Sequence, residues 1–389
     1  MYTQSYTNSE ECSMKVVVAI DSFKGSLSSI EAGTAVQKGI LAAHPDARVV
    51  VKPLADGGEG TTDALIEGMH GERITLTVTG PMHTLVDAYY GYLKDSGTAV
   101  MEMAMAAGIT LVPPDAKDPF LATSYGVGEM INDALARGCK SIILGIGGSA
   151  TNDGGIGMLK ALGVRFWDKD GDDAGEGAQV LSKITRVDIS HINPLLKNCH
   201  IQAACDVTNP LCGKNGATYV FGSQKGVADD EKEALDQAMA HFAKVTSDTL
   251  KNDYKAAPGA GAAGGLGFAL LSYLNATLTP GIELIEEAIR LEQDLSDADV
   301  VVTGEGRLDA QTAMGKAPIG VARLAKKYNA KVIAFAGSVT EEASVCNREG
   351  IDAFFPILRE VTTLAQAMDP LTARKNLTAT AEQVFRLLN

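Results

Sequence analysis

Continuous apolar runs at both ends of the chain predict buried parallel strands. Residues 14–20 (MKVVVAI) form one such run, and residues 299–303 (DVVVT) and 331–336 (KVIAFA) repeat the pattern near the C-terminus. Residues 28–43 have helical periodicity, with Ser28 or Ser29 as the candidate cap. Strands that alternate with helices predict a doubly wound, Rossmann-like α/β domain built from both chain ends. Its other expected elements are a strand at 48–54, a helix near 318–328, a further helix, a strand at 353–358 and a final helix.

The middle of the chain has a different pattern and predicts a second, inserted α/β domain. Short segments that look antiparallel come first, at 73–78, 88–93 and 99–102. The elements expected after them are a helix at 124–137, a strand at 141–146, another helix, a strand at 201–207 and a long helix over 229–251. We therefore expect one domain from residues 14–55 plus 285–389 and the other from 56–284. Residues 1–13 are polar, lack a signal-peptide pattern and are expected to form a disordered leader.

Charge and composition narrow the range of partners. The chain has 34 Lys and Arg against 48 Asp and Glu, a formal net charge of −14, and no basic cluster, so we expect no nucleic-acid partner. It has no apolar run of membrane-spanning length, so we expect no membrane span. The six cysteines are scattered without a CxxC pair, which favours reduced thiols and a cytoplasmic protein. The sequence leaves open whether the protein is a monomer or a homodimer.

Glycine-rich loops are the main candidates for phosphate binding. Residues 56–65 (DGGEGTTDAL) and 153–162 (DGGIGMLKAL) share the pattern D-G-G-x-G-x-x-x-A-L. Residues 264–270 (GGLGFAL) keep G-G-x-G, and the rest of the pattern is one residue shorter there. Each glycine pair is expected to open a helix, where free N–H groups and the helix dipole favour anions. The richest loop, 145–157, follows an apolar strand. The residues expected to bind nucleotide or phosphate are Gly147, Gly148, Ser149, Asn152, Asp153, Gly154, Gly155, Gly264 and Gly265.

Two of these loops have simpler interpretations. Asp153 could instead serve only as a helix cap, although the density of glycines and hydroxyl residues in its loop favours a functional role, and Asp56 with Glu59 would fit a capping box. The G-x-G-x-x-G at 259–264 lacks a preceding strand, so we reject a dinucleotide site there and expect a close backbone approach, to a ligand or to another helix.

Charged residues at strand ends complete the inventory. Asp21 and Lys24 follow the first strand, Asp206 lies at the end of the strand expected at 201–207, and Glu305 follows the strand at 299–303. A surface ion pair would also explain Asp21 with Lys24. The sequence has no Walker A loop, no protein-kinase signature and no spaced histidine set. Glycine loops, carboxylates and loop lysines together favour phosphoryl transfer.

As a set, these motifs resemble the bacterial glycerate kinase family. The motifs that carry the resemblance are DSFKGSLS (21–28), PLADGGEGT (53–61), TSYGVGEMI (123–131), IGGSATNDGG (146–155), CDVTNPLCG (205–213), FGSQKG (221–226), PGAGAAGGLG (258–267) and TGEGRLDAQT (303–312). The resemblance runs from Met14 to about Leu388, and Ser223 stands where proline is common in the family. It implies ATP-dependent phosphorylation of D-glycerate, usually to 2-phosphoglycerate, in the breakdown of glyoxylate, glucarate and galactarate.

Combined with the resemblance, the inventory suggests roles for individual residues. We expect Asp21, Lys24 and Asp206 to be catalytic, with Asp21 and Asp206 competing for the role of base or orienting group. We expect Mg²⁺ at Asp153 and Glu305, directly or through water. The residues expected to bind glycerate are Ser22, Asp56, Gly57, Gly58 and Glu59. The alternatives are a non-catalytic sensor of sugar acids or phosphometabolites, and a Mg²⁺-dependent phosphatase.

Overall fold

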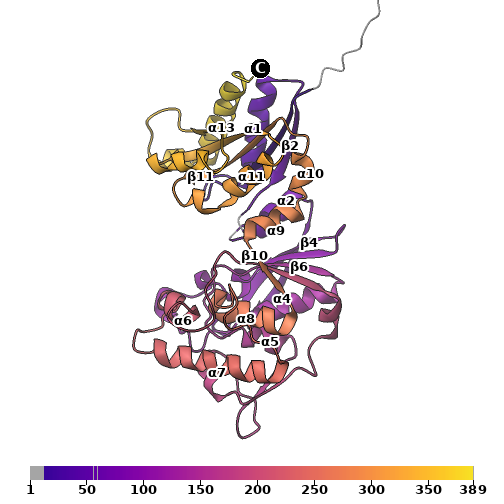
Figure 1. The fold of residues 1–389 in the computed structure, drawn as a ribbon, viewed down its shortest axis with the longest axis vertical. Coiled ribbons are helices and arrows are strands. Elements are labelled where there is room, and N and C mark those ends of the chain that lie inside the picture. The colour runs from indigo at the N-terminus through magenta and orange to yellow at the C-terminus, as the bar shows by residue number, and fades with distance from the viewer. Residues whose placement is uncertain (1–12, 56, 59, 389) are drawn as a thin grey trace, which may run out of the picture. The chain divides into compact units, whose positions relative to one another are not determined.

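The computed structural model describes residues 13–55, 57–58 and 60–388. They form two compact units. One contains the chain up to Leu54 and from Glu286 onward, and the other contains Ala55–Ile285 (Figure 1). Apart from Ser13, the expected leader lies outside the described residues, as do Asp56 and Glu59.

The first unit is built on a five-stranded parallel sheet in the order β13-β12-β11-β1-β2. The N-terminal strand β1 pairs with β2 on one side and with β11 on the other, where Val16 lies opposite Val300. Both chain ends therefore contribute to one sheet, which confirms the expected doubly wound architecture. The strand bounds are β1 (Lys15–Ile20), β2 (Arg48–Pro53), β11 (Val300–Leu308), β12 (Lys331–Val339) and β13 (Ala353–Pro356).

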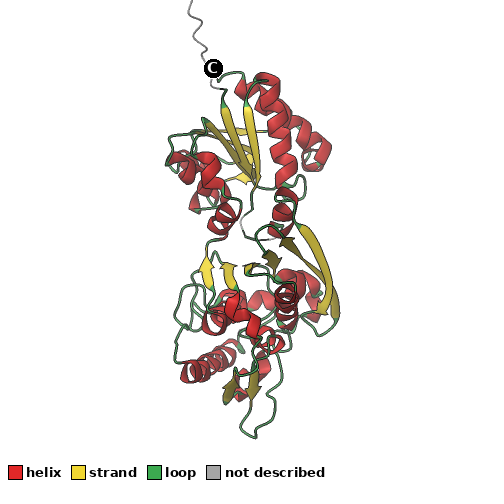
Figure 2. Ribbon diagram, turned by 90° about the vertical axis from the view of Figure 1, so that its right-hand side faces the viewer, coloured by secondary structure: helices red, strands yellow, loops and turns green. Residues whose placement is uncertain are grey.

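Helices cover both faces of this sheet (Figure 2). On one face, α1 (Ser29–Ala43) packs against α13 (Pro370–Phe385) and the two helices enclose β1 side chains such as Val18. Gly39 allows the close approach of these helices, because a Cβ at that position would lie 2.3 Å from the Thr378 carbonyl oxygen. Helix α11 (Ala317–Lys326) packs against β11 and β12. The remaining helices of this unit are α10 (Leu291–Leu295), α12 (Leu364–Met368), η6 (Thr312–Met314) and η7 (Glu341–Asn347).

Two local predictions in this unit have different outcomes. Ser28 is the cap of α1, and it forms a reciprocal capping box with Glu31, so the predicted helix start is confirmed. The helix expected between the last two strands is a short 3₁₀ helix, η7, rather than an α-helix. Because β12 continues to Val339, three residues beyond its apolar run, the connection to β13 is short.

The second unit contains a six-stranded mixed sheet in the order β10-β9-β6-β5-β4-β3. Strand β4 pairs antiparallel with β3 and with β5, as expected, whereas β5, β6, β9 and β10 are parallel. The strand bounds are β3 (Glu72–Thr79), β4 (Leu85–Leu93), β5 (Thr98–Glu102), β6 (Ser141–Gly145), β9 (His200–Ala204) and β10 (Thr277–Thr279), and a separate hairpin consists of β7 (Arg165–Trp167) and β8 (Arg186–Asp188).

Helices of this unit pack around a large apolar core. Phe166, Phe242 and Phe268 meet edge to face in that core, with ring centroids 5.8–5.9 Å apart along the series. Helix α9 (Gly281–Ala288) leads from this unit into the first. The other helices are α2 (Thr61–Gly68), α3 (Ala104–Ala107), η1 (Ile109–Leu111), η2 (Pro114–Ala116), α4 (Tyr125–Ala136), α5 (Ile156–Ala161), η3 (Ala178–Lys183), η4 (Pro194–Asn198), α6 (Ala217–Phe221), η5 (Ser223–Lys225), α7 (Lys232–Leu250) and α8 (Ala262–Leu274).

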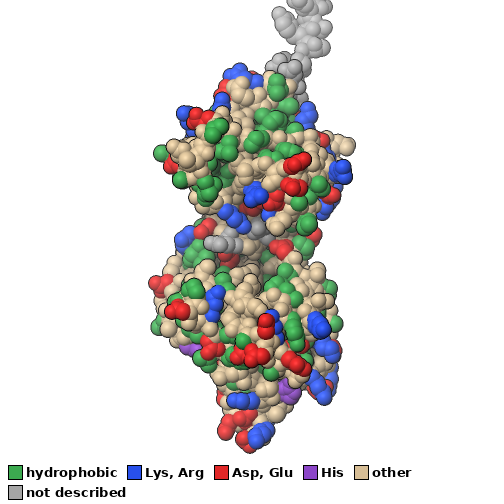
Figure 3. Space-filling model, turned by 90° about the vertical axis from the view of Figure 1, so that its left-hand side faces the viewer, with side chains coloured by type: hydrophobic (Ala, Val, Ile, Leu, Met, Phe, Trp, Pro, Cys, Tyr) green, Lys and Arg blue, Asp and Glu red, His purple; other side chains and the backbone are tan. Residues whose placement is uncertain are grey.

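The surface carries charges of both signs. On the face drawn in Figure 3, Lys and Arg side chains are interspersed with Asp and Glu. Within the described part of the chain, no helix combines the length and the apolar character needed to cross a membrane.

Candidate active site

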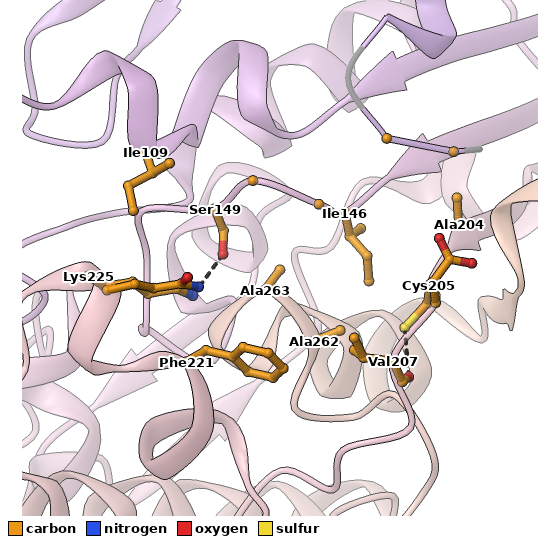
Figure 4. Close-up of a pocket in the computed structure, with 16 residues that line it drawn as sticks. Ile109, Ile146, Ser149, Ala204, Cys205, Val207, Phe221, Lys225, Ala262 and Ala263 are labelled. Carbon is orange, nitrogen blue, oxygen red and sulfur yellow. Dashed lines mark hydrogen bonds between the residues drawn. The ribbon is translucent and has the colours of Figure 1, made fainter. Parts of the chain in front are cut away.

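A pocket of about 390 Å³ opens at the carboxyl ends of β6 and β9 in the second unit (Figure 4). These strands are parallel neighbours, so the loops that follow them, from Ile146 and from Cys205, meet at one edge of the sheet. Phe221 and the loop after it form another part of the wall, together with Ala262 and Ala263 at the start of α8. The pocket therefore lies where α/β folds usually bind ligands.

Gly147, Gly148 and Ser149 form the glycine-loop side of the pocket. The backbone of Gly148 has φ +72°, which strongly favours glycine. Gly147 is exposed, and a Cβ added to it would meet no described atom within 4 Å. The protein's own packing therefore does not explain the glycine at 147, and this position leaves space for a ligand against the backbone.

The second half of the same loop faces the protein interior. The Asp153 carboxylate is fully buried and accepts four hydrogen bonds, from the Ser124 backbone and hydroxyl and from the backbone N–H groups of Gly155 and Gly157, at 2.7–3.2 Å. Asn152 is also fully buried, and its amide donates to the Thr218 hydroxyl. Asp153 therefore holds the start of α5 against the start of α4, as in the simpler interpretation of this motif.

The third glycine motif packs against the second. Gly154 donates its backbone N–H to the Gly264 carbonyl at 2.9 Å. A Cβ on Gly264 would lie 2.1 Å from the Thr151 carbonyl oxygen, and one on Gly265 would lie 2.8 Å from the Gly154 Cα. Gly154, Gly264 and Gly265, like Gly155, are buried outside the pocket lining. The close backbone approach expected of this motif is thus to another loop of the protein.

Asp206 provides the pocket's carboxylate. It follows β9 by two residues, is exposed, and its Oδ1 accepts a hydrogen bond from Gly281 N, the first residue of α9, at 2.9 Å. Gly57 and Gly58 also line the pocket, and a Cβ on Gly57 would clash with Gly281 Cα at 2.7 Å. The structure therefore groups Asp206, Gly57 and Gly58 with the Gly147–Ser149 segment.

Lys225 lines the same pocket, although the sequence alone assigned it no role. Its side chain is 2% exposed, and Nζ donates to Ser149 Oγ at 2.7 Å and to the Thr151 carbonyl at 2.6 Å (Figure 4). Burial lowers the pKa of Lys225 from 10.5 to about 7, and the charge of Asp153 opposes part of this shift. The only sequence signal was its place in the FGSQKG motif.

Glu102 is a second buried charged residue at this edge of the sheet. It is 3% exposed at the end of β5, and it accepts a hydrogen bond from Thr62 N at the start of α2 at 2.9 Å. Burial raises the pKa of Glu102, and the hydrogen bonds from Thr62 and Gly60 oppose the shift. Glu102 therefore anchors α2 next to Gly145, and a carboxylate directly after an apolar strand was its sequence signal.

In the first unit, Asp21, Ser22 and Glu305 lie at the switch point of the sheet, where β1 meets β11. Asp21 N donates to the Gly304 carbonyl at 2.9 Å, and Ser22 N donates to Asp21 Oδ1 at 2.6 Å. Glu305 accepts a hydrogen bond from the Thr312 hydroxyl at 2.6 Å, and its other oxygen lies 4.0 Å from Lys316 Nζ.

Lys24 is exposed in the loop that follows Ser22. Its backbone nitrogen would lie 3.7 Å from a Cβ built on Gly306, which places this loop beside the C-terminal part of β11. The predicted site residues thus fall into two sets, one in each unit.

The described residues do not contain a ready-made metal cage. No group of three or more His, Cys, Asp and Glu side chains among them is arranged to hold a metal ion. Magnesium that arrives with a nucleotide needs only one or two protein carboxylates, because phosphate oxygens and water supply the other ligands.

Comparisons with known proteins identify the family. Residues 16–389 match the glycerate kinase family. The chain is 48% identical to the glycerate 2-kinase of Escherichia coli K12, over 91% of this chain and 93% of that protein. It is 46% identical to the glycerate kinase of Bacillus subtilis 168, over 92% and 93% of the two chains. The crystal structure of a Salmonella typhimurium LT2 protein assigned as glycerate kinase 2 superposes with a TM-score of 0.90 at 46% identity, over 97% of this chain and 98% of that one.

These matches span nearly the whole chain and confirm the resemblance that the motifs carry. The likeness to a solved structure extends across both units, which agrees with the fold described above. The chain belongs to the glycerate kinase family.

Proposed function

We propose that this chain is an ATP-dependent glycerate 2-kinase that acts in the breakdown of glyoxylate and sugar acids. It would transfer the γ-phosphoryl group of ATP to the C2 hydroxyl of D-glycerate and release ADP and 2-phosphoglycerate. The observation that supports this most strongly is the pocket at the ends of β6 and β9, which combines an open glycine loop with the carboxylate of Asp206. The Escherichia coli relative, named glycerate 2-kinase, supports the position of transfer.

The glycine loop is suited to binding phosphate. The backbone of Gly147 and Gly148 is exposed at the end of a parallel strand, and an exposed backbone can donate N–H groups to phosphate oxygens. Ser149 adds a hydroxyl at the same wall. We assign these three residues to the nucleotide phosphates. Asn152, Asp153, Gly154, Gly155, Gly264 and Gly265, predicted to share this role, would instead hold the loop in position from behind.

Asp206 is our choice for the group that orients the attacking hydroxyl. As the hydroxyl oxygen forms its bond to the γ-phosphorus, the bond from phosphorus to the bridging oxygen of ADP breaks, and the hydroxyl proton passes to the carboxylate. Asp206 is exposed in the pocket, whereas Asp21 is 6% exposed in the first unit. The prediction that Gly57 and Gly58 bind glycerate remains part of the proposal, because both line this pocket. The roles predicted for Ser22 and Lys24, which belong to the first unit, stay predictions from the sequence.

Magnesium would enter as part of MgATP and neutralise charge on the transferred group. The role of Glu305, which lies in the first unit, stays a prediction from the sequence. Both oxygens of Asp153 already accept hydrogen bonds from the protein, so Asp153 is better suited to positioning the loop than to binding metal. The sensor and phosphatase alternatives gain no support, because the named relatives are kinases.

An assay of ADP formation tests the proposal. The purified protein is incubated with MgATP and D-glycerate, and with L-glycerate or buffer as controls. We expect ADP to form from ATP as D-glycerate is consumed, and we expect only slow ATP hydrolysis in the controls. Absence of D-glycerate-dependent ADP would contradict the kinase assignment, and release of inorganic phosphate from 2-phosphoglycerate without nucleotide would favour the phosphatase.

A further inference from the structure

The buried lysine of the FGSQKG motif is not explained by the fold. Lys225 is 2% exposed, and no ion pair between described residues includes it. Its two hydrogen bonds, to Ser149 Oγ and the Thr151 carbonyl, use two of the three protons of an ammonium group. Burying a charge without a partner in contact is costly, so a cation placed at a pocket wall favours an anionic ligand in that pocket.

The chain fixes this lysine in place at both sides of its short helix. Gly226 ends η5 with φ +104°, a conformation that favours glycine. Gly222 packs against the preceding turn, where a Cβ would lie 2.3 Å from the Thr218 carbonyl oxygen. These contacts restrict the conformation of the backbone around Lys225. The close-up shows the side chains of Lys225 and Ser149 pointing toward each other along one wall of the pocket (Figure 4). The ammonium is therefore positioned in advance, which lowers the entropic cost of binding.

A purely structural role explains the contacts less well. A neutral donor on η5 could make the hydrogen bond to the Thr151 carbonyl without the cost of desolvating an ammonium group. The charged groups around Lys225 are Asp153, whose charge favours protonation, Asp206, which lines the same pocket, and Lys117 and Asp118, which line a small adjoining space with it. Because the Asp153 oxygens already accept hydrogen bonds from other donors, this carboxylate does not act as a contact partner for Lys225.

We propose that Lys225 and the Gly147–Ser149 segment form an oxyanion subsite that binds the γ-phosphate of the nucleotide. This assignment rests on the proposed function and adds to it a residue and a specific phosphate. The glycine loop favours phosphate over a carboxylate, because an exposed glycine backbone suits an anion with several oxygens. Lys225 then provides the positive charge and Ser149 the hydroxyl, which is already oriented by Lys225 Nζ. The low pKa of Lys225, about 7, means that an anion beside it would draw a proton onto the amine.

The test compares Lys225→Met with Lys160→Met. Lys160 is a matched control in the same unit, because its Nζ also donates to one side-chain oxygen, that of Asp173, and to one carbonyl, that of Gly175. Isothermal titration calorimetry measures the affinity of each protein for the ATP analogue AMP-PNP with Mg²⁺, for ADP and for D-glycerate. We expect Lys225→Met to weaken AMP-PNP binding at least tenfold, with smaller changes for ADP and D-glycerate, and Lys160→Met to bind as wild type does.

Other outcomes would overturn the assignment. A loss of D-glycerate affinity with AMP-PNP affinity intact would make the subsite one for the substrate carboxylate. Normal binding of all three ligands would show that Lys225 only supports the fold, through its hydrogen bonds to Ser149 and Thr151. Failure of the kinase proposal would be recognised separately, as wild-type protein that does not bind AMP-PNP. Inorganic pyrophosphate would then still test the subsite, and wild type that binds pyrophosphate no better than Lys225→Met would reject it.

A measurement on wild-type protein covers the case in which Lys225→Met fails to fold. Titrations of AMP-PNP at pH 8 in two buffers of different ionisation enthalpy give the number of protons taken up on binding. An amine with a pKa of about 7 is mostly neutral at pH 8 and becomes protonated beside the γ-phosphate, so we expect uptake of close to one proton. Uptake near zero would contradict the contact between Lys225 and phosphate.

Discussion

Replacing Asp153 by asparagine is expected to destabilise the second unit rather than to remove a contact with a ligand. In the buried carboxylate, Oδ2 accepts hydrogen bonds from Ser124 N, Ser124 Oγ and Gly157 N, and Oδ1 accepts one from Gly155 N. Asparagine keeps a single oxygen. Its NH₂ group must therefore face at least one of these donors.

The magnitude follows from this count of hydrogen bonds. Leaving one buried donor unpaired costs about 1–3 kcal/mol. The three bonds to the remaining oxygen change from charge-assisted to neutral, which removes about 1 kcal/mol from each. Relief of the cost of burying a charge offsets part of this loss. The net loss in the free energy of unfolding should be about 3 kcal/mol, a large share of the roughly 5–15 kcal/mol of a typical domain.

Urea unfolding followed by circular dichroism measures this change. The control is Asp206→Asn, the same chemical change at an exposed carboxylate that accepts a hydrogen bond from Gly281 N at the start of a helix. Asparagine caps helices about as well as aspartate does, so this control should lose less than about 1 kcal/mol. An Asp153→Asn protein with wild-type stability and abolished turnover would refute the reasoning. It would show instead that Asp153 acts on a ligand or metal, as the sequence alone had suggested.

Three further predictions follow from the same geometry. Asp206→Asn should lower kcat at least 100-fold while stability stays near wild type, because general bases contribute about 10²–10⁴-fold; kcat within tenfold of wild type would exclude Asp206 as the base. Gly264→Ala should lower the melting temperature far more than Gly138→Ala, because both have positive φ but only at Gly264 would the Cβ clash, with the Thr151 carbonyl; equal losses would contradict the packing account. The stability of wild type relative to Lys225→Met should rise between pH 7 and 9 by about 1 kcal/mol per pH unit, because the unfolded lysine (pKa near 10.5) binds more protons than the folded one (pKa about 7) in this range; a difference that does not change with pH would contradict the lowered pKa.

The sequence predicted the fold well where a pattern is local and strong. The apolar run that became β1 and the capping box at Ser28 are recognisable from adjacent residues, and both are present in the structure. The antiparallel strands β3 and β4 were recognised in the same way. The extension of β12 to Val339 was missed, because it depends on pairing with β11 as far as Leu308 and not on the apolar run itself.

The site was harder to predict because similar local motifs have different surroundings. The segments at Gly147, Gly154 and Gly264 all look like phosphate loops in the sequence, but of these three glycines only Gly147 lines the pocket. The other two pack against each other through the bond from Gly154 N to the Gly264 carbonyl, a contact across 110 residues that no local pattern encodes. Lys225 was overlooked for the same reason, since its burial depends on Ser149 and Thr151, 76 and 74 residues earlier in the chain.

The measurement that tests the central claim most directly is NMR of the product formed from D-glycerate and MgATP. Proton–phosphorus correlation shows which carbon carries the phosphate ester, so one spectrum reports both the reaction and its position. The proposed function predicts coupling of phosphorus to the single proton on C2, the signature of 2-phosphoglycerate. Coupling to the two protons on C3 would contradict the assigned position, and a spectrum without a phosphate ester would contradict the kinase itself.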